Sequence, residues 1–570
     1  MPADSQPKRW ARSQCDPDSV ARIARELGVS ETTATLLVNR GFSEPEPANK
    51  FLHPKQSDLH DPFLMADMRN AVDRIMRAVA NKEKILVYGD YDVDGTTSTI
   101  ILKRALAMVG AEVSFHIPER LKDGYGLNKE AMEHARADGF RLIISVDTGI
   151  RAHEVVDHAR QLGLDIIITD HHLPEAALPA ANAVLNPKRT DCSYPNKSLA
   201  GVGVAFKLVQ ALLQETGRER YLPSFMKIAA IGTIADIVPL VGENRVIAKF
   251  GLQGLSSPKN AGLRALLKMA GLEGQGVSCP DIAFRVAPRI NAMGRMAGAT
   301  AVVELFDAPD MTIAMKLATE IEEQNLKRQK MSGDIMAQVL AAIESEPEIR
   351  NALIAVIAGD GWHRGVIGIA ASRVVDLINR PAIVISIEEG VGHGSARSIP
   401  GFHLLDAMAS CGDLFERFGG HAQAAGLAIQ AGRIPELRRR INRFAEGMLN
   451  RNDLVPVIEI DCELPIKLAR PEMLAELKLF EPYGCANPEP VFETHGVEVV
   501  APPRSLKDKH LKLRVMQGGR AADCLWWGES ARTEDIFVGD HLSLAFTLAE
   551  NNYGGFTQVQ LELRDAKIST

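Results

Sequence analysis

Short apolar runs alternate with helical windows between residues 84 and 170, and this alternation constrains the fold more than any other feature. The runs ILVY, EVSFHI, LIISV and DIIIT are short and β-rich, as buried strands are. Between them lie a helical window over 97–108, which ends at Gly110, and another around 153–162, which ends at Gly163. The alternation is typical of βαβ units and predicts a parallel sheet.

The rest of the 570-residue chain is long enough for several more domains. A highly charged helical stretch runs from 310 to 343, a second α/β pattern begins at LIAVIAG, and short alternating strands follow residue 455. The predicted order is an α/β catalytic domain, a long helix, a second α/β domain and a small β-barrel, after a helical lead-in. The expected boundaries are 1–65 for the lead-in, 66–300 for the catalytic domain, 301–350 for the helix, 351–450 for the second domain and 451–570 for the barrel.

Composition limits the class of protein and the cellular compartment that fit this sequence. The formal charge of −7 does not suit a chain that grips nucleic acid through overall positive charge, although a basic groove can coexist with it. Seven scattered cysteines without a C-x-x-C pair speak against a disulfide framework and a thiolate zinc site. Neither a signal peptide nor a membrane-length apolar run is visible. We therefore expect a soluble, cytoplasmic protein without a membrane segment.

The acidic segment Asp90–Gly95 follows the first predicted strand directly, so its carboxylates lie at the end of the sheet where open α/β folds bind ligands. One interpretation is a solvated turn. A calcium-binding EF-hand loop is excluded, because its twelfth position would be Ile101 and a strand precedes it. The substring from Asp92 to Thr96 also resembles the nucleophile motif of dehalogenase-type phosphatases, in which the first aspartate is the nucleophile.

The same placement of polar residues recurs at two more strand ends. Asp147 follows LIISV, and the triplet Asp170-His171-His172 follows DIIIT. Neighbouring parallel strands end at one edge, so these side chains are expected to converge, and Asp236 could join them from the end of an apolar helix. Mixed carboxylate and imidazole ligands suit manganese or magnesium, with imidazole favouring manganese. Two such cations about 3.5–4 Å apart would hydrolyse a phosphate ester.

With these residues in hand, the chain resembles the DHH phosphoesterase superfamily over roughly residues 60 to 570. Further segments match that family's linking region and its second domain, named DHHA1. They are PRINAMGR at 288–295, GWHRGVIG at 361–368, GHGSARS at 392–398, GGHAQAAG at 419–426 and FEPYGCANPEP at 480–490. The resemblance also implies that the carboxyl-terminal barrel is an OB-fold.

The resemblance assigns roles to the metal-site residues. Asp92 would hold one cation and Asp94 the other, Asp147 would bridge both, and His171 with Asp236 would complete the ligands of the second cation. His172 would meet the scissile phosphate and protonate the leaving oxygen. Asp90 is a further candidate ligand, because relatives with small substrates carry a histidine at the position of Tyr88. The implied cofactors are two divalent cations, with Mn²⁺ preferred and Mg²⁺ as the alternative.

The resemblance also implies a pocket for the 5′-terminal phosphate of the substrate. Arg120, Ser395 and Arg397 match the residues that hold it, which suits the planar guanidinium fork and a glycine-rich backbone. The alternative for residues 392–398 is an ordinary tight turn. His421 is a further candidate in the same cleft or packs against its own turn. Arg289 and Arg295 are expected to face the DNA path or to be structural ion-pair partners.

The activity implied is a 5′-to-3′ exonuclease that is specific for single-stranded DNA, releases mononucleotides, and acts in DNA repair and recombination. A monomer is expected, with a single-strand-binding protein and a helicase as partners. In the barrel, basic residues precede two adjacent tryptophans and are expected to contact DNA: Arg504, Lys507, Lys509, His510, Lys512 and Arg514, followed by Trp526 and Trp527. The alternatives are a phosphoesterase of oligoribonucleotides or cyclic dinucleotides, and a DNA-binding scaffold without activity.

Overall fold

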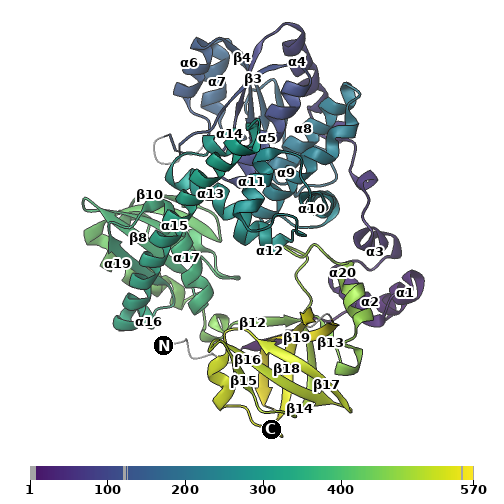
Figure 1. Ribbon diagram of the computed structural model, residues 1–570. Helices are drawn as coiled ribbons and strands as arrows, with labels where there is room; N and C mark the ends of the chain where they lie inside the picture. Colours follow the sequence, from purple (N-terminus) through teal and green to yellow (C-terminus); the bar gives the residue numbers. More distant parts are fainter. Residues whose placement is uncertain (1–7, 120–122, 125, 554–555, 569–570) are drawn as a thin grey trace. The chain divides into compact units, whose positions relative to one another are not determined.

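The computed structural model describes residues 8–119, 123–124, 126–553 and 556–568. It divides into two compact units, which are described separately (Figure 1). The larger unit comprises Arg12–Glu322 and Ile460–Thr570, and the smaller unit is built on Glu323–Glu459. Among the described residues, no helix has both the length and the apolar character that a membrane span requires.

The first sheet of the larger unit is parallel throughout, as predicted. Its strand order is β3-β2-β4-β5-β6. The strands are β2 (Lys84–Tyr88), β3 (Glu112–His116), β4 (Phe140–Val146), β5 (Asp165–Thr169) and β6 (Ala183–Leu185). The chain leaves β2 toward β3 on one side and returns to β4 on the other. This reversal creates a topological switch point between β2 and β4, which is where open α/β sheets bind their ligands.

Helices cover both faces of this sheet (Figure 1). One face packs against α4 (Met68–Ala80), α5 (Val93–Met108) and α8 (Gly201–Glu215), and the other against α6 (Lys129–Ala137) and α7 (His153–Gln161). Successive strand residues alternate between the two cores, with Ile85 and Val87 in the first and Leu86 and Tyr88 in the second. Burial on both faces explains why the strand sequences are continuous apolar runs.

A layer of helices extends the hydrophobic core on the α4, α5 and α8 face of the sheet. A long helix follows this layer in the chain. The layer contains α9 (Leu222–Ala235), α10 (Gly242–Leu255), α11 (Ala261–Met269), α12 (Cys279–Asp281), a π-helical turn (Ile282–Val286), α13 (Ala287–Met296) and α14 (Thr300–Asp307). The predicted charged helix is confirmed as α15 (Met311–Ser345), which crosses from the larger unit into the smaller one.

The smaller unit contains a mixed sheet of order β10-β11-β9-β8-β7, in which only β7 and β8 are parallel. Its strands are β7 (Ala355–Asp360), β8 (Ala382–Glu388), β9 (Val391–Arg397), β10 (Phe415–Gly420) and β11 (Ala424–Gln430). Its helices are α16 (Pro347–Arg350), α17 (Arg364–Ile378), α18 (Leu404–Ala409) and α19 (Ile434–Glu446). A separate short sheet pairs β1 (Arg9–Arg12) with β12 (Val457–Ile460).

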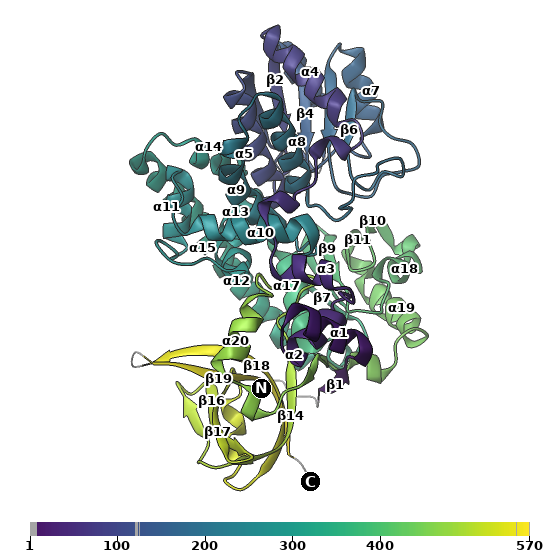
Figure 2. The same ribbon diagram turned by 90° about the vertical axis from the view of Figure 1, so that its right-hand side faces the viewer.

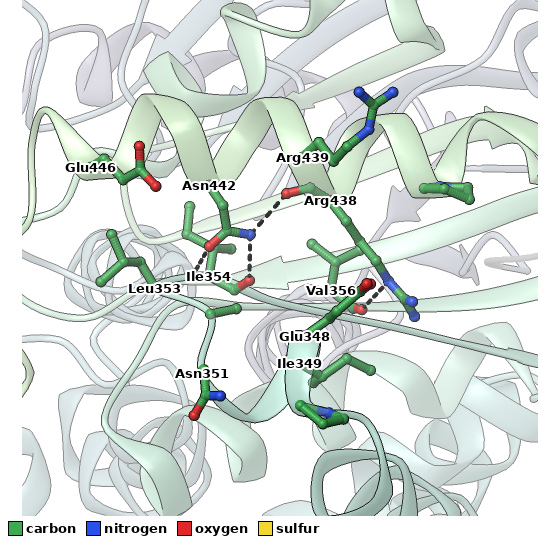
Figure 3. Close-up of a pocket in the computed structure, with 13 residues that line it drawn as sticks. Glu348, Ile349, Asn351, Leu353, Ile354, Val356, Arg438, Arg439, Asn442 and Glu446 are labelled. Carbon is green, nitrogen blue, oxygen red and sulfur yellow. Dashed lines mark hydrogen bonds between the residues drawn. The ribbon is translucent and has the colours of Figure 1, made fainter.

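Side chains of α19 occupy the outer edge of the unit's sheet, beside a pocket that α16 also lines (Figure 3). The amide of Asn442 accepts from Ile354 N at 3.0 Å and donates to Ile354 O at 3.1 Å, as a neighbouring strand would. Arg438 Nε donates to Val356 O at 3.0 Å. These bonds satisfy backbone groups of an edge strand that would otherwise be open to pairing with another chain.

The carboxyl-terminal strands form the predicted barrel. The order β14-β18-β19-β17-β16 closes on itself because β14 also pairs with β16. These strands are β14 (Phe492–Val499), β16 (His510–Gln517), β17 (Arg520–Trp526), β18 (His541–Tyr553) and β19 (Phe556–Ile568). Two short strands, β13 (Cys462–Glu463) and β15 (Arg504–Leu506), extend the sheet, and α20 (Pro471–Lys478) precedes the barrel.

The amino-terminal helices share a core with the barrel, a role that the sequence did not predict. They are α1 (Pro17–Leu27), α2 (Glu31–Asn39) and α3 (Pro45–Leu52). Ile23, Leu37 and Phe51 pack in one cluster with Leu477 and Phe480, and Figures 1 and 2 show α1 and α2 beside α20. The helices α1–α3 and the carboxyl-terminal barrel therefore belong to one folded body.

A buried arginine of α10 makes several hydrogen bonds to this body. Arg245 is 1% exposed, and its guanidinium donates to the carbonyl oxygens of Phe51, Phe480, Leu479 and Glu481 at 2.7–3.0 Å. Burial lowers the pKa of Arg245 to about 10, so the side chain stays protonated at neutral pH. Four carbonyl acceptors make a buried cation tolerable here.

Candidate metal centre

The acidic segment forms the junction between β2 and α5. Asp92 is the residue that caps α5, because its carboxylate accepts a hydrogen bond from Gly95 N at 2.9 Å. The helix therefore begins at Val93, four residues earlier than the predicted start at Thr97, and Asp94 lies in its first turn. Both carboxylates are placed at the positive end of the helix dipole, which favours their charged form.

The amino terminus of α8 holds Asp94 from the opposite side. Gly201 N and Val202 N donate to the two carboxylate oxygens of Asp94, each at 2.7 Å. A Cβ atom on Gly201 would lie 2.4 Å from Asp147 Oδ1, so only glycine fits at this point. Gly201 was not predicted from the sequence. Its signal was a glycine at the start of an otherwise apolar helix.

Asp147 occupies a strained and buried position at the end of β4. Its φ of +60° is uncommon for a residue with a side chain, although aspartate tolerates it better than most. The residue is 2% exposed, and Oδ1 accepts no hydrogen bond from the described residues. A buried carboxylate oxygen without a donor is costly unless a cation binds it.

The imidazole of His171 lies among three of these carboxylates. Its Nε2 atom is 3.3 Å from Asp147 Oδ1, 3.7 Å from Asp236 Oδ2 and 3.9 Å from Asp94 Oδ2. Possible ligand atoms fall into three overlapping groups, each within 4.8 Å, that together contain Asp90, Asp92, Asp94, Asp147, His171, His172 and Asp236. The structure thus brings together every candidate metal ligand that the sequence indicated.

The protonation of this cluster fits a divalent cation. Burial, together with the neighbouring carboxylates, raises the pKa of Asp94 and Asp147 well above the usual range, and it raises that of Asp236 to about 7. Burial also lowers the pKa of His171 to about 4, which leaves a neutral ring with a free lone pair. Crowded carboxylates with a neutral imidazole are a donor set that suits manganese or magnesium.

Asp170 organises the histidine pair, a role that was not assigned from the sequence. Its buried carboxylate accepts hydrogen bonds from the backbone N–H groups of Ile150, His171 and His172 at 2.7–3.0 Å. It also bonds His172 Nδ1 at 2.7 Å. Burial opposes the charged ring, but this bond and the charge of Asp170 raise the pKa of His172. Asp170 therefore favours a protonated His172 whose side chain is 46% exposed.

Tyr88 supports a neighbouring loop and not the cluster. Its side chain is fully buried, and its hydroxyl donates to Gly126 O at 3.0 Å and accepts from Asn128 Nδ2 at 3.3 Å. Tyr88, which stands at the position of the histidine expected in small-substrate relatives, is thus a buried residue that supports this loop.

The predicted DNA contacts of the larger unit have different surroundings. Arg120 lies outside the described residues. Arg289 forms an ion pair with Glu322, with Nε 2.6 Å from Oε2, and both side chains are largely buried. Its guanidinium also donates to Arg285 O and Met269 O, which fits the interpretation as a structural ion-pair partner. Arg295 is half-buried on α13.

In the smaller unit, Ser395 and Arg397 lie on β9. A tight turn over residues 392–398 is therefore wrong, because β9 runs through them as a central strand. Arg397 Nη1 donates to Ser395 Oγ at 3.0 Å, so the two side chains adjoin as a shared phosphate site requires. His421 is exposed, and its Nδ1 accepts from Gln423 N at 3.3 Å, which matches the interpretation as a turn residue.

The barrel divides the predicted basic run into paired and unpaired members. Lys512 and Arg514 both pair with Asp523, at 3.1 and 3.0 Å, which offsets part of their charge. The two tryptophans point in opposite directions, as predicted for strand neighbours. Trp526 is buried, whereas Trp527 is 52% exposed and contacts the ring of His510 with centroids 4.7 Å apart. Arg504, Lys507 and Lys509 are exposed.

A doubly wound sheet with an aspartate and histidine cluster at its switch point is the arrangement expected for a DHH phosphoesterase. Residues 84–233 match the DHH family, N-terminal domain, residues 350–447 the DHHA1 domain, and residues 460–565 the RecJ OB domain. The single-stranded-DNA-specific exonuclease RecJ of Bacillus subtilis is 40% identical, and the match covers 98% of this chain and 71% of the relative's length. The protein of the same name from Dickeya dadantii is 35% identical, and the match covers 96% of each chain. The chain belongs to the RecJ family.

A solved structure agrees with this assignment. RecJ of Thermus thermophilus in complex with Mn²⁺ superposes with a TM-score of 0.84 at 30% identity, over 99% of this chain and 80% of that one. The same protein in complex with Mg²⁺ gives a TM-score of 0.79 at 29% identity, over 99% of this chain and 79% of that one.

Proposed function

We propose that the chain is a metal-dependent exonuclease specific for single-stranded DNA, which removes mononucleotides from the 5′ end. The observation that carries this proposal is the convergence of Asp94, Asp147, His171 and Asp236 at the switch point of a chain that also carries an OB domain. The names of the relatives at 32–40% identity support the substrate.

Two divalent cations are the cofactors that we propose, with Mn²⁺ preferred over Mg²⁺ because of the imidazole ligand. Asp92 would hold one, His171 and Asp236 would complete the ligands of the other with Asp94, and Asp147 would serve both. When bound, such cations supply a hydroxide at neutral pH and offset negative charge on the phosphate. The orphaned Asp147 Oδ1 and the neutral His171 support this arrangement.

The protein's own groups provide the proton transfer. Asp170 fixes the ring of His172 through Nδ1 and raises its pKa, which favours the protonated form, whose other nitrogen can donate a proton to the leaving oxygen. His172 is the most exposed side chain of the cluster, which suits a group that meets the substrate.

DNA is held by two surfaces in this proposal. Ser395 and Arg397 would bind the 5′-terminal phosphate through a hydroxyl and a guanidinium fork. On the barrel, the exposed Trp527 would stack on a base, which contributes about 1–3 kcal/mol in comparable sites. Arg504, Lys507 and Lys509 would contact the phosphate backbone.

Time courses on 5′- and 3′-labelled single and double strands, with Mn²⁺ and Mg²⁺ compared, test the activity. We expect early release of labelled mononucleotide from the 5′-labelled single strand alone. Cleavage of cyclic dinucleotides or short oligoribonucleotides without attack on single-stranded DNA would refute the proposal in favour of a small-substrate phosphoesterase.

The proposed phosphate site has its own test. Arg397→Ala should reduce the preference for a 5′-phosphorylated over a 5′-hydroxyl end by about tenfold or more, because a charge-assisted bond to phosphate is lost. Lys330→Ala, which changes a lysine of α15 outside the proposed site, is the control. Unchanged discrimination in Arg397→Ala would remove this residue from the site.

A further inference from the structure

The carboxyl end of β6 brings a fourth strand end to the metal centre. The parallel register pairs Thr169 of β5 with Leu185 of β6, and Asp170 N bonds Leu185 O at 3.0 Å. His172 and Lys188 each lie three residues past that pair. Lys188 belongs to none of the motifs that carry the family resemblance.

A buried asparagine fixes this end of β6 against the histidine pair. Asn186 is fully buried, its Nδ2 donates to His172 O at 2.8 Å, and its Oδ1 accepts from Lys188 N at 2.8 Å. One side chain therefore holds the backbone of both His172 and Lys188. The half-buried Lys188 is positioned by the same contact that positions the proposed proton donor.

The ammonium of Lys188 is not committed to another partner in the described part of the chain. No carboxylate there lies within 4.0 Å of it, in contrast to Arg289, which is paired with Glu322. Burial dominates the pKa values of His171, His172 and Asp236, and the positive charge of Lys188 lowers all three. The cation therefore lies near enough to these three groups for its charge to act on them.

The side of the metal centre near Lys188 is the more exposed one. Asp94 and Asp147 have side chains that are only 2–3% exposed, whereas Asp236 is 26% and His172 46% exposed. Asp92, Asp236 and His172 are the accessible members of the cluster, so a substrate can approach it past His172 and Asp236. Lys188 is a cation near this entrance, beside a site whose fixed side-chain charges are otherwise mostly negative.

We propose that Lys188 binds the phosphate of the first internucleotide linkage of the DNA, next to His172. This role rests on the proposed exonuclease function and deepens it by naming a substrate-binding residue of the same site. A lysine suits the task because a compact ammonium contacts a non-bridging phosphate oxygen without requiring a fixed orientation. The contact is to the backbone, so it favours no base.

The test measures DNA binding in the Asp147→Ala background, in which turnover is expected to be absent. A 5′-phosphorylated single strand with a 3′ fluorophore is titrated by anisotropy across a series of salt concentrations. Lys188→Met should weaken binding about threefold to tenfold and reduce the slope of log Kd against log salt by about 0.7, the value for one lost phosphate contact on a single strand. Lys188→Arg should retain the slope.

A matched control and a modified substrate make the result specific. Lys84→Met changes a lysine at the amino end of β2, on the opposite edge of the same sheet, and should leave both quantities unchanged. A strand with an uncharged methylphosphonate at its first linkage should bind equally to the protein with Lys188 and to the Lys188→Met variant. An unaltered slope in Lys188→Met, or a loss that persists on the methylphosphonate strand, would overturn the assignment. Failure of the parent itself to bind single-stranded DNA would instead reject the proposed function, and this role with it.

Discussion

At the scale of single residues, Asp147 combines backbone strain with a buried carboxylate. Its backbone lies at φ +60°, its side chain is buried, and its charge faces Asp94 and Asp92. Strain and unpaired burial at one position cost stability and persist where function requires them.

The Asp147→Ala variant should lose hydrolysis by at least about a thousandfold, because a ligand shared by two cations is removed. Binding of single-stranded DNA should fall less than about threefold, since few base or backbone contacts change. Rates in Mn²⁺ and anisotropy titrations measure the two effects. Asp147→Asn, which also tolerates a positive φ, controls for backbone strain, and appreciable turnover in either variant would contradict the two-cation assignment.

The pH dependence of the reaction should depend on Asp170. Its hydrogen bond and charge raise the pKa of His172, so a step that needs protonated His172 proceeds up to that raised pKa and declines above it. Asp170→Asn weakens both effects, and the alkaline decline in kcat should therefore begin at lower pH. A pH profile measures the shift, and thermal unfolding reports any general loss of fold. A profile that stays in place while kcat falls would assign Asp170 a purely structural role.

The sequence located the candidate ligands but not the residues that hold them in place. Asp92, Asp94, Asp147 and His171 could be predicted because each stands next to the carboxyl end of a parallel strand, and such ends adjoin. Gly201 could not, since its contacts with Asp94 and Asp147 span more than 50 residues of chain and depend on how α8 packs.

At the scale of elements, sequence periodicity predicted the strands and helices that local patterns determine. It missed a strand that depends on tertiary packing. The strands β2, β4 and β5 were visible as apolar runs. The strand β9 was not, because the sequence GHGSAR has low strand propensity and reads as a turn. Its glycines are required by neighbours: a Cβ atom on Gly392 or Gly394 would lie 2.8 Å from side-chain atoms of Ile385 or Leu427.

The approach of α8 to the metal centre should be sensitive to a single methyl group. Gly201→Ala places Cβ against Asp147 Oδ1, so the helix terminus or the carboxylate must move, and Mn²⁺ affinity should fall about 10–100-fold. Calorimetric titration with Mn²⁺ measures this change. Gly203→Ala is the matched control in the same turn, because its Cβ would meet only side-chain atoms of Leu199 at 3.2 Å. Equal Mn²⁺ affinity in both variants would show that the close approach is not needed.

At the scale of the whole molecule, the larger unit is held together by segments from both ends of the chain. The helices α1 to α3 and the barrel share one core, and α10 of the catalytic region reaches both through Arg245. This arrangement could not be predicted from the sequence, because neither an amino-terminal amphipathic helix nor an isolated arginine indicates its distant partner.

Arg245→Met should destabilise the larger unit by about 3–5 kcal/mol. The substitution preserves much of the apolar stem but removes the arginine donor from the carbonyl oxygens of Phe51, Leu479 and Glu481, and leaves Phe480 O with only its bond from Asn487 Nδ2; each unsatisfied group is costly. Differential scanning calorimetry should show a lower Tm, and the transition should broaden or split as the catalytic region loses its connection to the shared core of α1–α3 and the barrel. Lys249→Met, one turn along α10, is the control, because its ammonium makes a single 3.4 Å contact with Leu52 O and should cost less than about 1 kcal/mol. A single transition at the original temperature in Arg245→Met would mean that apolar packing alone joins the two regions.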